Sequence, residues 1–159
     1  MKILTLLTLC TLISCSHTHT SNIKTDIQAY KESAQKLISL NNSNASEIKL
    51  KAMSLELISK ATPIINSHKK RFPKCSELMD TITSSATKMT NLTLEQIEKD
   101  YHEGAALPKA DDSCYEAKEL IVHPATVAIL TKTKLNTESR EQINEEIEEV
   151  LAHIDMLAL

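Results

Sequence analysis

The scarcity of glycine is the feature that most limits what this chain can fold into. Gly104 is the single glycine among 159 residues, tryptophan is absent, and there are three tyrosines and one phenylalanine. β-Sandwiches and barrels need frequent turn residues, and loops that cradle phosphates need glycine for close backbone approach. Because Leu, Ile, Ala, Glu, Lys and Ser are abundant instead, we expect an all-α protein without nucleotide-dependent chemistry.

Apolar residues recur at three- and four-residue steps along most of the chain, which is the period of a helix buried on one face. The pattern predicts a helical bundle of about four principal helices with short additional helices, in a single domain over 23–159. The expected helices span about 23–40, 46–68, 75–89, 94–102 and 113–135, and a last one ends near 157. Pro124 either kinks the fifth helix or starts a new one.

The helix pattern also predicts which side chains face inward and where helices begin. In the second helix the expected inward stripe is Ile48, Ala52, Leu55, Ile58 and Ile65. Thr93 with Gln96, and Ser113 with Glu116, have the spacing of capping boxes. The last helix has an apolar stripe from Ile143 to Leu157, and its glutamates are expected on the outer face: Glu138, Glu141, Glu145, Glu146, Glu148 and Glu149.

The first fifteen residues contain an apolar run too short to span a bilayer, followed by Leu12-Ile13-Ser14-Cys15. This segment resembles the signal peptide and lipobox of bacterial lipoproteins. The resemblance implies that residues 1–14 are removed and that the Cys15 sulfur carries diacylglycerol, so that acyl chains (palmitate and its like) anchor the protein to a membrane. Residues 15–22 would form a polar tether, and Ser16 favours the outer membrane. An ordinary secretory signal and a retained apolar anchor are the alternatives.

The remaining cysteines form a pair. If Cys10 leaves with the signal and Cys15 carries lipid, Cys75 and Cys114 remain, and in an oxidising envelope we expect them to be bonded. A bond across this span restricts the unfolded chain by roughly 4 kcal/mol in the loop-entropy description. A redox-active pair is the alternative, but the close Cys-x-x-Cys spacing typical of such pairs is absent.

The segment from Tyr101 to Pro124 gathers unusual residues: two tyrosines, two histidines, the single glycine, two prolines and a cysteine. One interpretation is purely structural, with Gly104 ending a helix and Pro108 bending the chain. The other places a metal or polar ligand among residues whose imidazoles and carboxylates suit zinc, copper or iron: His102, Glu103, Glu116 and His123. No spacing matches a known catalytic metal motif, and no cofactor is expected.

Charge and motifs limit the function classes. A formal charge of −3 and a pI near 6.1 argue against nucleic-acid binding, which needs a basic excess. No organised nucleophile motif is present, so we expect no enzyme. The sequence predicts an outer-membrane lipoprotein facing the periplasm, a non-enzymatic binding or assembly module whose partner is another envelope protein. The alternative is a small-ligand or metal-binding bundle that uses the 101–124 region.

Overall fold

The computed structural model describes residues 22–157, so the predicted signal peptide, Cys15 and nearly all of the tether lie outside the described residues. All the regular structure within 22–157 is helical, which confirms the all-α prediction. The long helices are α1 (Ile23–Asn42), α2 (Glu47–Arg71), α3 (Ser76–Met89), α5 (Tyr115–Leu130) and α6 (Thr137–Leu157). Shorter elements are α4 (Leu94–Ile97) and the turns η1 (Pro73–Cys75), η2 (Glu98–His102) and η3 (Asp112–Cys114).

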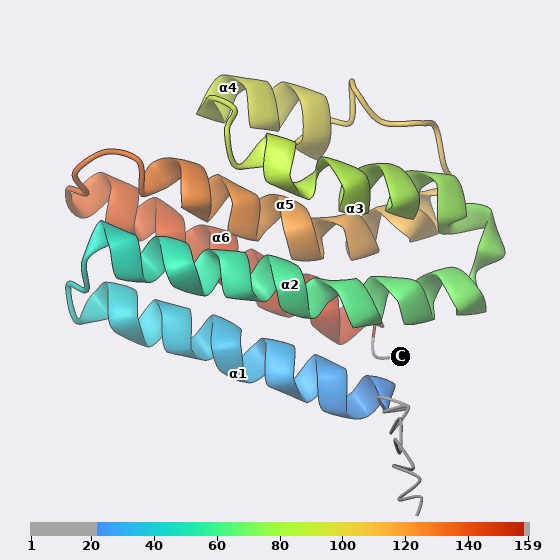
Figure 1. Ribbon diagram of the computed structural model, residues 1–159, viewed down its shortest axis with the longest axis horizontal. Helices are drawn as coiled ribbons and strands as arrows, with labels where there is room; N and C mark the ends of the chain where they lie inside the picture. Colours follow the sequence, from blue (N-terminus) through green and yellow to red (C-terminus); the bar gives the residue numbers. More distant parts are fainter. Residues whose placement is uncertain (1–21, 158–159) are drawn as a thin grey trace, which may run out of the picture.

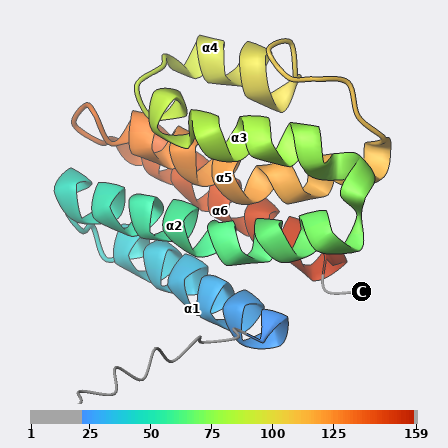
Figure 2. The same ribbon diagram turned by 45° about the vertical axis from the view of Figure 1, so that its right-hand side comes forward.

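Four of the long helices close into a ring. Helix α1 packs on α2 and α6, and α5 packs on the same two neighbours, so α1, α2, α5 and α6 surround one core. Figures 1 and 2 show α3 and α4 along one side of this bundle, where both pack against α5. The prediction of about four principal helices with additional short ones is confirmed, and α5 is the helix with neighbours on most sides.

The position of α5 explains why its sequence is buried nearly all round. Every residue from Leu120 to Leu130 is buried, including the polar His123 and Thr126, so this stretch lacks the single apolar stripe of a helix that packs on one side only. Each fully buried Leu, Ile or Val stabilises the fold by roughly 1.5–3 kcal/mol relative to exposure. Tyr30 of α1 reaches across the core and donates its hydroxyl to the Leu120 carbonyl at 2.8 Å. The core therefore fixes α5 against both α1 and α6.

The predicted inward stripe of α2 is partly wrong. Ile48 is 83% exposed and Leu55 43% exposed, whereas Leu50, Met53 and Leu57 are buried. Two apolar stripes interleave in this helix, and packing against α1 and α5 selects the one that includes Leu50 and Leu57. Pro63 lies inside the unbroken helix. It neither ends nor restarts the helix.

The expected starts and ends of the later helices are confirmed in part. The Thr93–Gln96 capping box is present, with Thr93 Oγ1 accepting from the Gln96 amide at 3.2 Å and Gln96 Oε1 from the Thr93 amide at 3.0 Å. The prediction of a capping box at Ser113 and Glu116 is wrong. Asp111 instead caps η3, where its side chain accepts a hydrogen bond from the Ser113 amide at 3.2 Å. Helix α5 continues through Pro124, so no new helix starts there, and it ends at Leu130.

The predicted disulfide is present. Cys75 and Cys114 are bonded, with their Cα atoms 5.4 Å apart and both side chains buried. The bond joins η1, just before α3, to η3, just before α5. It therefore fixes the start of α5, one of the two helices that supply most of the side chains described next.

Candidate metal centre

Three histidines from three separate elements meet beside α5. His102 ends η2, His123 lies in the middle of α5, and His153 lies in the last turns of α6. The ring centroids of His102 and His123 are 4.8 Å apart, edge to face, and those of His123 and His153 are 5.4 Å apart, stacked. With the four glutamates around them they form what we call the histidine cluster: His102, Glu116, Glu119, His123, Glu146, Glu149 and His153.

The inner half of the histidine cluster is a set of donors that lie within reach of one ion, with His123 buried and His102 and Glu146 partly buried. His123 Nδ1 is hydrogen-bonded to Glu146 Oε2 at 2.8 Å, and His102 Nε2 lies 4.0 Å from the same oxygen. One donor atom from each of these three residues lies within 4.8 Å of the others. Imidazole and carboxylate together are the donors that zinc, copper and iron accept.

A second carboxylate, that of Glu119, faces the same two rings. Its Oε2 lies 3.5 Å from His102 Nδ1 and 3.7 Å from His123 Nε2. Its other oxygen accepts from the buried Lys118 ammonium, which also donates to the His102 carbonyl at 3.1 Å. Lys118 thus orients Glu119 and leaves Oε2 directed at the histidines.

Two of these atoms are buried without any hydrogen-bond partner: Glu119 Oε2 and His123 Nε2. Their separation of 3.7 Å is too long for a hydrogen bond. It is close to the spacing of about 3.4 Å between two donors that bind one tetrahedral ion at about 2.0–2.2 Å each. A buried polar atom left unpaired costs about 1–3 kcal/mol. A cation between the two atoms removes that cost.

The electrostatics of the inner half suit a cation. Burial lowers the pKa of His102 and of His123, and each is lowered further by a neighbouring histidine. The two imidazoles are therefore neutral near pH 7, the form that can donate a lone pair to a metal. Burial raises the pKa of Glu146 to about 7. The site is short of positive charge when all its carboxylates are ionised.

Local backbone structure explains how these residues meet. Glu119 and His123 are four residues apart on α5 and so lie on one helix face, which packs against the α6 turn that contains Glu146. His102 is placed by η2, a π-helical turn, and such turns are rare and occur frequently at functional sites. Thr126 Oγ1 lies 3.3 Å from His102 Nε2 and helps to fix that ring.

The structure corrects the predicted ligand set. His102 and His123 do come together, but Glu103 is exposed and outside the cluster. Glu116 lies at its outer edge, bonded to His153 Nδ1 at 2.5 Å. Sequence reasoning missed Glu119 and placed Glu146 on the outer face, yet the Glu146 side chain is only 14% exposed.

One signal in the sequence could have found the missed residues. The spacing Glu-x2-Glu-x3-His occurs twice, as Glu116, Glu119 and His123 and again as Glu146, Glu149 and His153. Each triplet falls on one face of its helix.

No protein-family model, curated protein or solved structure matches this chain. The function must therefore be argued from the geometry of its own residues.

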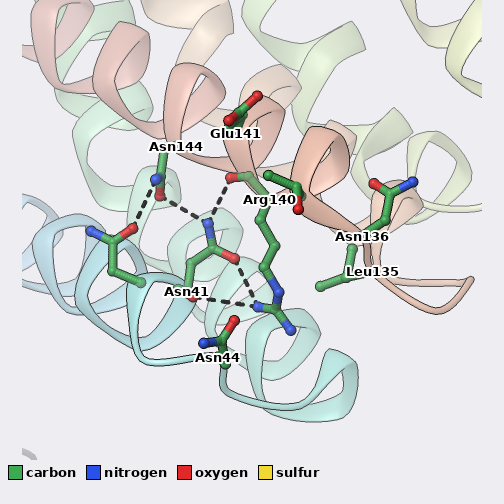
Figure 3. Close-up of a pocket in the computed structure, with 9 residues that line it drawn as sticks. Asn41, Asn44, Leu135, Asn136, Arg140, Glu141 and Asn144 are labelled. Carbon is green, nitrogen blue, oxygen red and sulfur yellow. Dashed lines mark hydrogen bonds between the residues drawn. The ribbon is translucent and has the colours of Figure 1, made fainter.

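A second group of polar side chains lies nearer the start of α6, and we call it the asparagine–arginine junction: Asn41, Arg140 and Asn144. Asn41 Nδ2 donates to the Arg140 carbonyl at 2.7 Å and to Asn144 Oδ1 at 2.9 Å. Arg140 donates from Nη1 to Asn41 Oδ1 at 3.1 Å and from Nη2 to the Ala45 carbonyl at 3.2 Å. Figure 3 shows these residues lining an open pocket of about 420 Å³. Because their donors and acceptors pair with one another, they act as a clamp between α1 and α6.

Proposed function

We propose that this protein binds a divalent transition-metal ion at a site formed by His102, Glu119, His123 and Glu146. The observation that carries the proposal is the buried pair Glu119 Oε2 and His123 Nε2, which face each other without hydrogen-bond partners. Two imidazoles and two carboxylates, with no thiolate, favour zinc, copper(II), nickel or iron(II) over calcium and magnesium, which prefer all-oxygen sites.

Each residue has a distinct part in this proposal. His102 and His123 supply neutral imidazole nitrogens, and Glu119 supplies the oxygen that Lys118 leaves unoccupied. Glu146 accepts a hydrogen bond from His123 Nδ1 and so fixes the orientation of that ring, as carboxylates commonly do for metal-binding histidines. Lys118 is a positioning residue, because it contacts Glu119 and the His102 carbonyl and not the proposed ion.

The location of the protein is a second part of the proposal. No helix within residues 22–157 is long and apolar enough to cross a membrane. The lipobox resemblance at Cys15 supports a lipid anchor, which would hold the metal-binding bundle at the envelope membrane. The envelope-protein partner and the absence of enzymatic activity stay predictions. Replacement of Cys15 by Ala tests the anchor: lipid labelling should disappear and the protein should leave the membrane fraction.

Metal titration of the full chain, purified in detergent and stripped with a chelator, tests the metal site. We expect Zn²⁺ to bind in competition with a chromophoric chelator. His102→Ala and His123→Ala should each weaken the tightest binding step by about 100-fold or more, because a direct ligand matters at least as much as the outer partners that cost 10–100-fold. Glu119→Gln keeps the shape but removes the charge, and it should weaken binding too.

A matched control separates a ligand from a merely buried histidine. His68 of α2 is also buried with an unpartnered Nε2, and burial lowers its pKa, but it has no carboxylate within ion-pair distance among residues 22–157. His68→Gln should leave Zn²⁺ affinity unchanged while disturbing the core to a similar degree. If all these variants bind Zn²⁺ as the parent does, or if the parent binds none of the four metals, the proposal is wrong.

A further inference from the structure

The three elements that bring side chains to the inner half of the histidine cluster differ in how they are held. Helices α5 and α6 are long and pack on each other in the core. His102 comes instead from the last residue of η2, a π-helical turn of five residues. Figures 1 and 2 show the chain after this turn running as a loop along the outside of the bundle before it enters α5. His102 is thus the one proposed ligand that does not lie on a core helix.

The segment 102–111, which we call the strap, is anchored at both ends and exposed between them. Tyr101, just before it, is 2% exposed, and Cys114, three residues beyond it, is held by the disulfide. Asp111, at the far end of the strap, pairs with Lys74 at 2.9 Å. No residue of the strap itself is buried. Segments with few buried apolar contacts open at a lower free-energy cost than the core does.

The backbone hydrogen bonds at the start of the strap are those of a wide turn. The amides of Ala105 and Ala106 donate to the carbonyls of Lys99 and Asp100, six residues back, at 3.1 and 3.0 Å. In an α-helix each amide bonds to the carbonyl four residues back. Gly104 lies within this turn at φ 83°, a left-handed conformation that favours glycine. The shape of the strap therefore depends on one glycine and a few local bonds.

Three contacts join His102 to α5. Its Nδ1 lies 3.5 Å from Glu119 Oε2, and its Nε2 lies 3.3 Å from Thr126 Oγ1. Its carbonyl accepts a hydrogen bond from the Lys118 ammonium at 3.1 Å. An ion bound to both His102 and Glu119 would add a further link between the strap and α5, at the place where the strap meets the cluster.

From these observations we infer that the strap opens and closes over the proposed metal site, with His102 as the ligand that it brings to the ion. The inference rests on the proposed function and adds the route by which the ion enters and leaves. Opening takes His102 out of the ligand set, while Glu119 and His123 stay in place on α5. An ion that binds the closed form more tightly must in turn hold the strap closed, because the coupling between the two events is reciprocal.

Amide hydrogen exchange of the full chain, purified in detergent and stripped of metal, measures this opening. The amides of Ala105, Ala106 and Leu107 report on the strap, because each donates one of its backbone bonds. Saturating Zn²⁺ should slow their exchange by about 100-fold, the factor by which loss of His102 is expected to weaken binding. In His102→Ala, saturating Zn²⁺ should leave their exchange unchanged. The Ala45 amide, in the turn between α1 and α2, is the internal reference and should not respond in either protein.

Gly104→Ala tests the strap without removing a ligand. A Cβ at this position meets no atom of the described residues within 4 Å, so the variant penalises only the left-handed backbone. We expect the metal-free strap to exchange about tenfold faster, and bound Zn²⁺ to pass to a competing chelator up to about tenfold faster. Asn44→Ala is the matched control, since Asn44 has φ 58° in the turn between α1 and α2. It should change neither rate.

The possible results separate this inference from the proposed function. If Zn²⁺ binds the parent but leaves strap exchange unchanged, the inference is wrong and the metal-binding function stands. The same conclusion follows if Zn²⁺ protects the strap of His102→Ala as well as that of the parent, or if Gly104→Ala behaves like Asn44→Ala. If the parent binds no metal, both proposals are wrong.

Discussion

The histidine cluster and the asparagine–arginine junction both place polar side chains between α6 and a neighbouring helix, yet they differ in how completely those groups are paired. In the junction, Asn41 and Arg140 exchange hydrogen bonds with each other and with nearby carbonyls. In the cluster, Glu119 Oε2 and His123 Nε2 remain unpaired although both are buried. Buried polar side chains whose hydrogen bonds are satisfied therefore indicate a structural role. Buried polar atoms that have no hydrogen-bond partner, and that lie at the spacing of two metal ligands, indicate a binding site.

The largest expected effect is metal-dependent stabilisation of the cluster alone. Zn²⁺ at 1,000 times its dissociation constant should raise the free energy of unfolding by about 4 kcal/mol, because the ion binds the folded chain. Asn41→Ala should show the same increment and His123→Ala about 1.4 kcal/mol or less, because a site weakened 100-fold is then only about tenfold above its dissociation constant. Urea unfolding with and without Zn²⁺ measures both. An equal loss of the increment in the two variants would mean that the regions are not independent.

The next effect belongs to the junction. Asn41→Ala should lower the free energy of unfolding by about 3 kcal/mol, since it leaves donors and acceptors of Arg140 and Asn144 unpaired in a partly buried setting. The measurement is urea unfolding in excess chelator. A change below about 0.5 kcal/mol, within the range of ordinary surface substitutions, would contradict the clamp.

A pH-dependent effect of about 2 kcal/mol distinguishes the cluster in its metal-free form. Burial raises the pKa of Glu146 to about 7 from an ordinary 4.5. Its contribution to stability is therefore full below pH 4.5 and is lost as the pH rises through 7. In excess chelator, Glu146→Gln should gain stability relative to the parent between pH 5 and pH 8.

His102 and His123 have lowered pKa values and act in the opposite direction, since their contribution is lost as the pH falls. The Glu146→Gln variant also removes the charge that raises the pKa of His102, so the difference between the two proteins measures Glu146 together with its effect on that histidine. Parallel stability curves for the two proteins would show that Glu146 has an ordinary pKa.

The smallest expected effect is that of Arg140→Lys. Arg140 uses two nitrogens to reach Asn41 and the Ala45 carbonyl, whereas a lysine ammonium on a flexible stem cannot reproduce that fork. The variant should unfold with a free energy about 1 kcal/mol lower than the parent, and its Zn²⁺ affinity should not change. Thermal unfolding followed by circular dichroism measures the first, and the chelator competition measures the second.

Much of the fold could be predicted because its signals are local. The single glycine at position 104 has φ 83° and follows the end of η2, as its place in the sequence indicated. The Cys75–Cys114 bond followed from counting cysteines. In contrast, the prediction of which α2 side chains face inward was partly wrong. Ile48 and Leu55 have the same period as Leu50 and Leu57, and periodicity cannot choose between two interleaved stripes.

The candidate site could be predicted only in part. His102 and His123 stood out because they lie in a compositionally unusual segment. Glu119 and Glu146 did not, because a glutamate in a helix rich in glutamates gives no sign of whether it faces water or a neighbouring ring. The assignment of Glu146 to the outer face failed for this reason.

The amino-acid sequence by itself determined that the chain is helical, that its two described cysteines pair, and that its unusual residues concentrate at 101–124. These properties depend on backbone preference, period and count, which are read from neighbours along the chain. Only the tertiary structure decided which of two apolar stripes of α2 is buried, and that α5 and α6 bring two Glu-x2-Glu-x3-His triplets together with His102. Those outcomes depend on the register between antiparallel helices. That register is set by packing between side chains that are distant in the sequence.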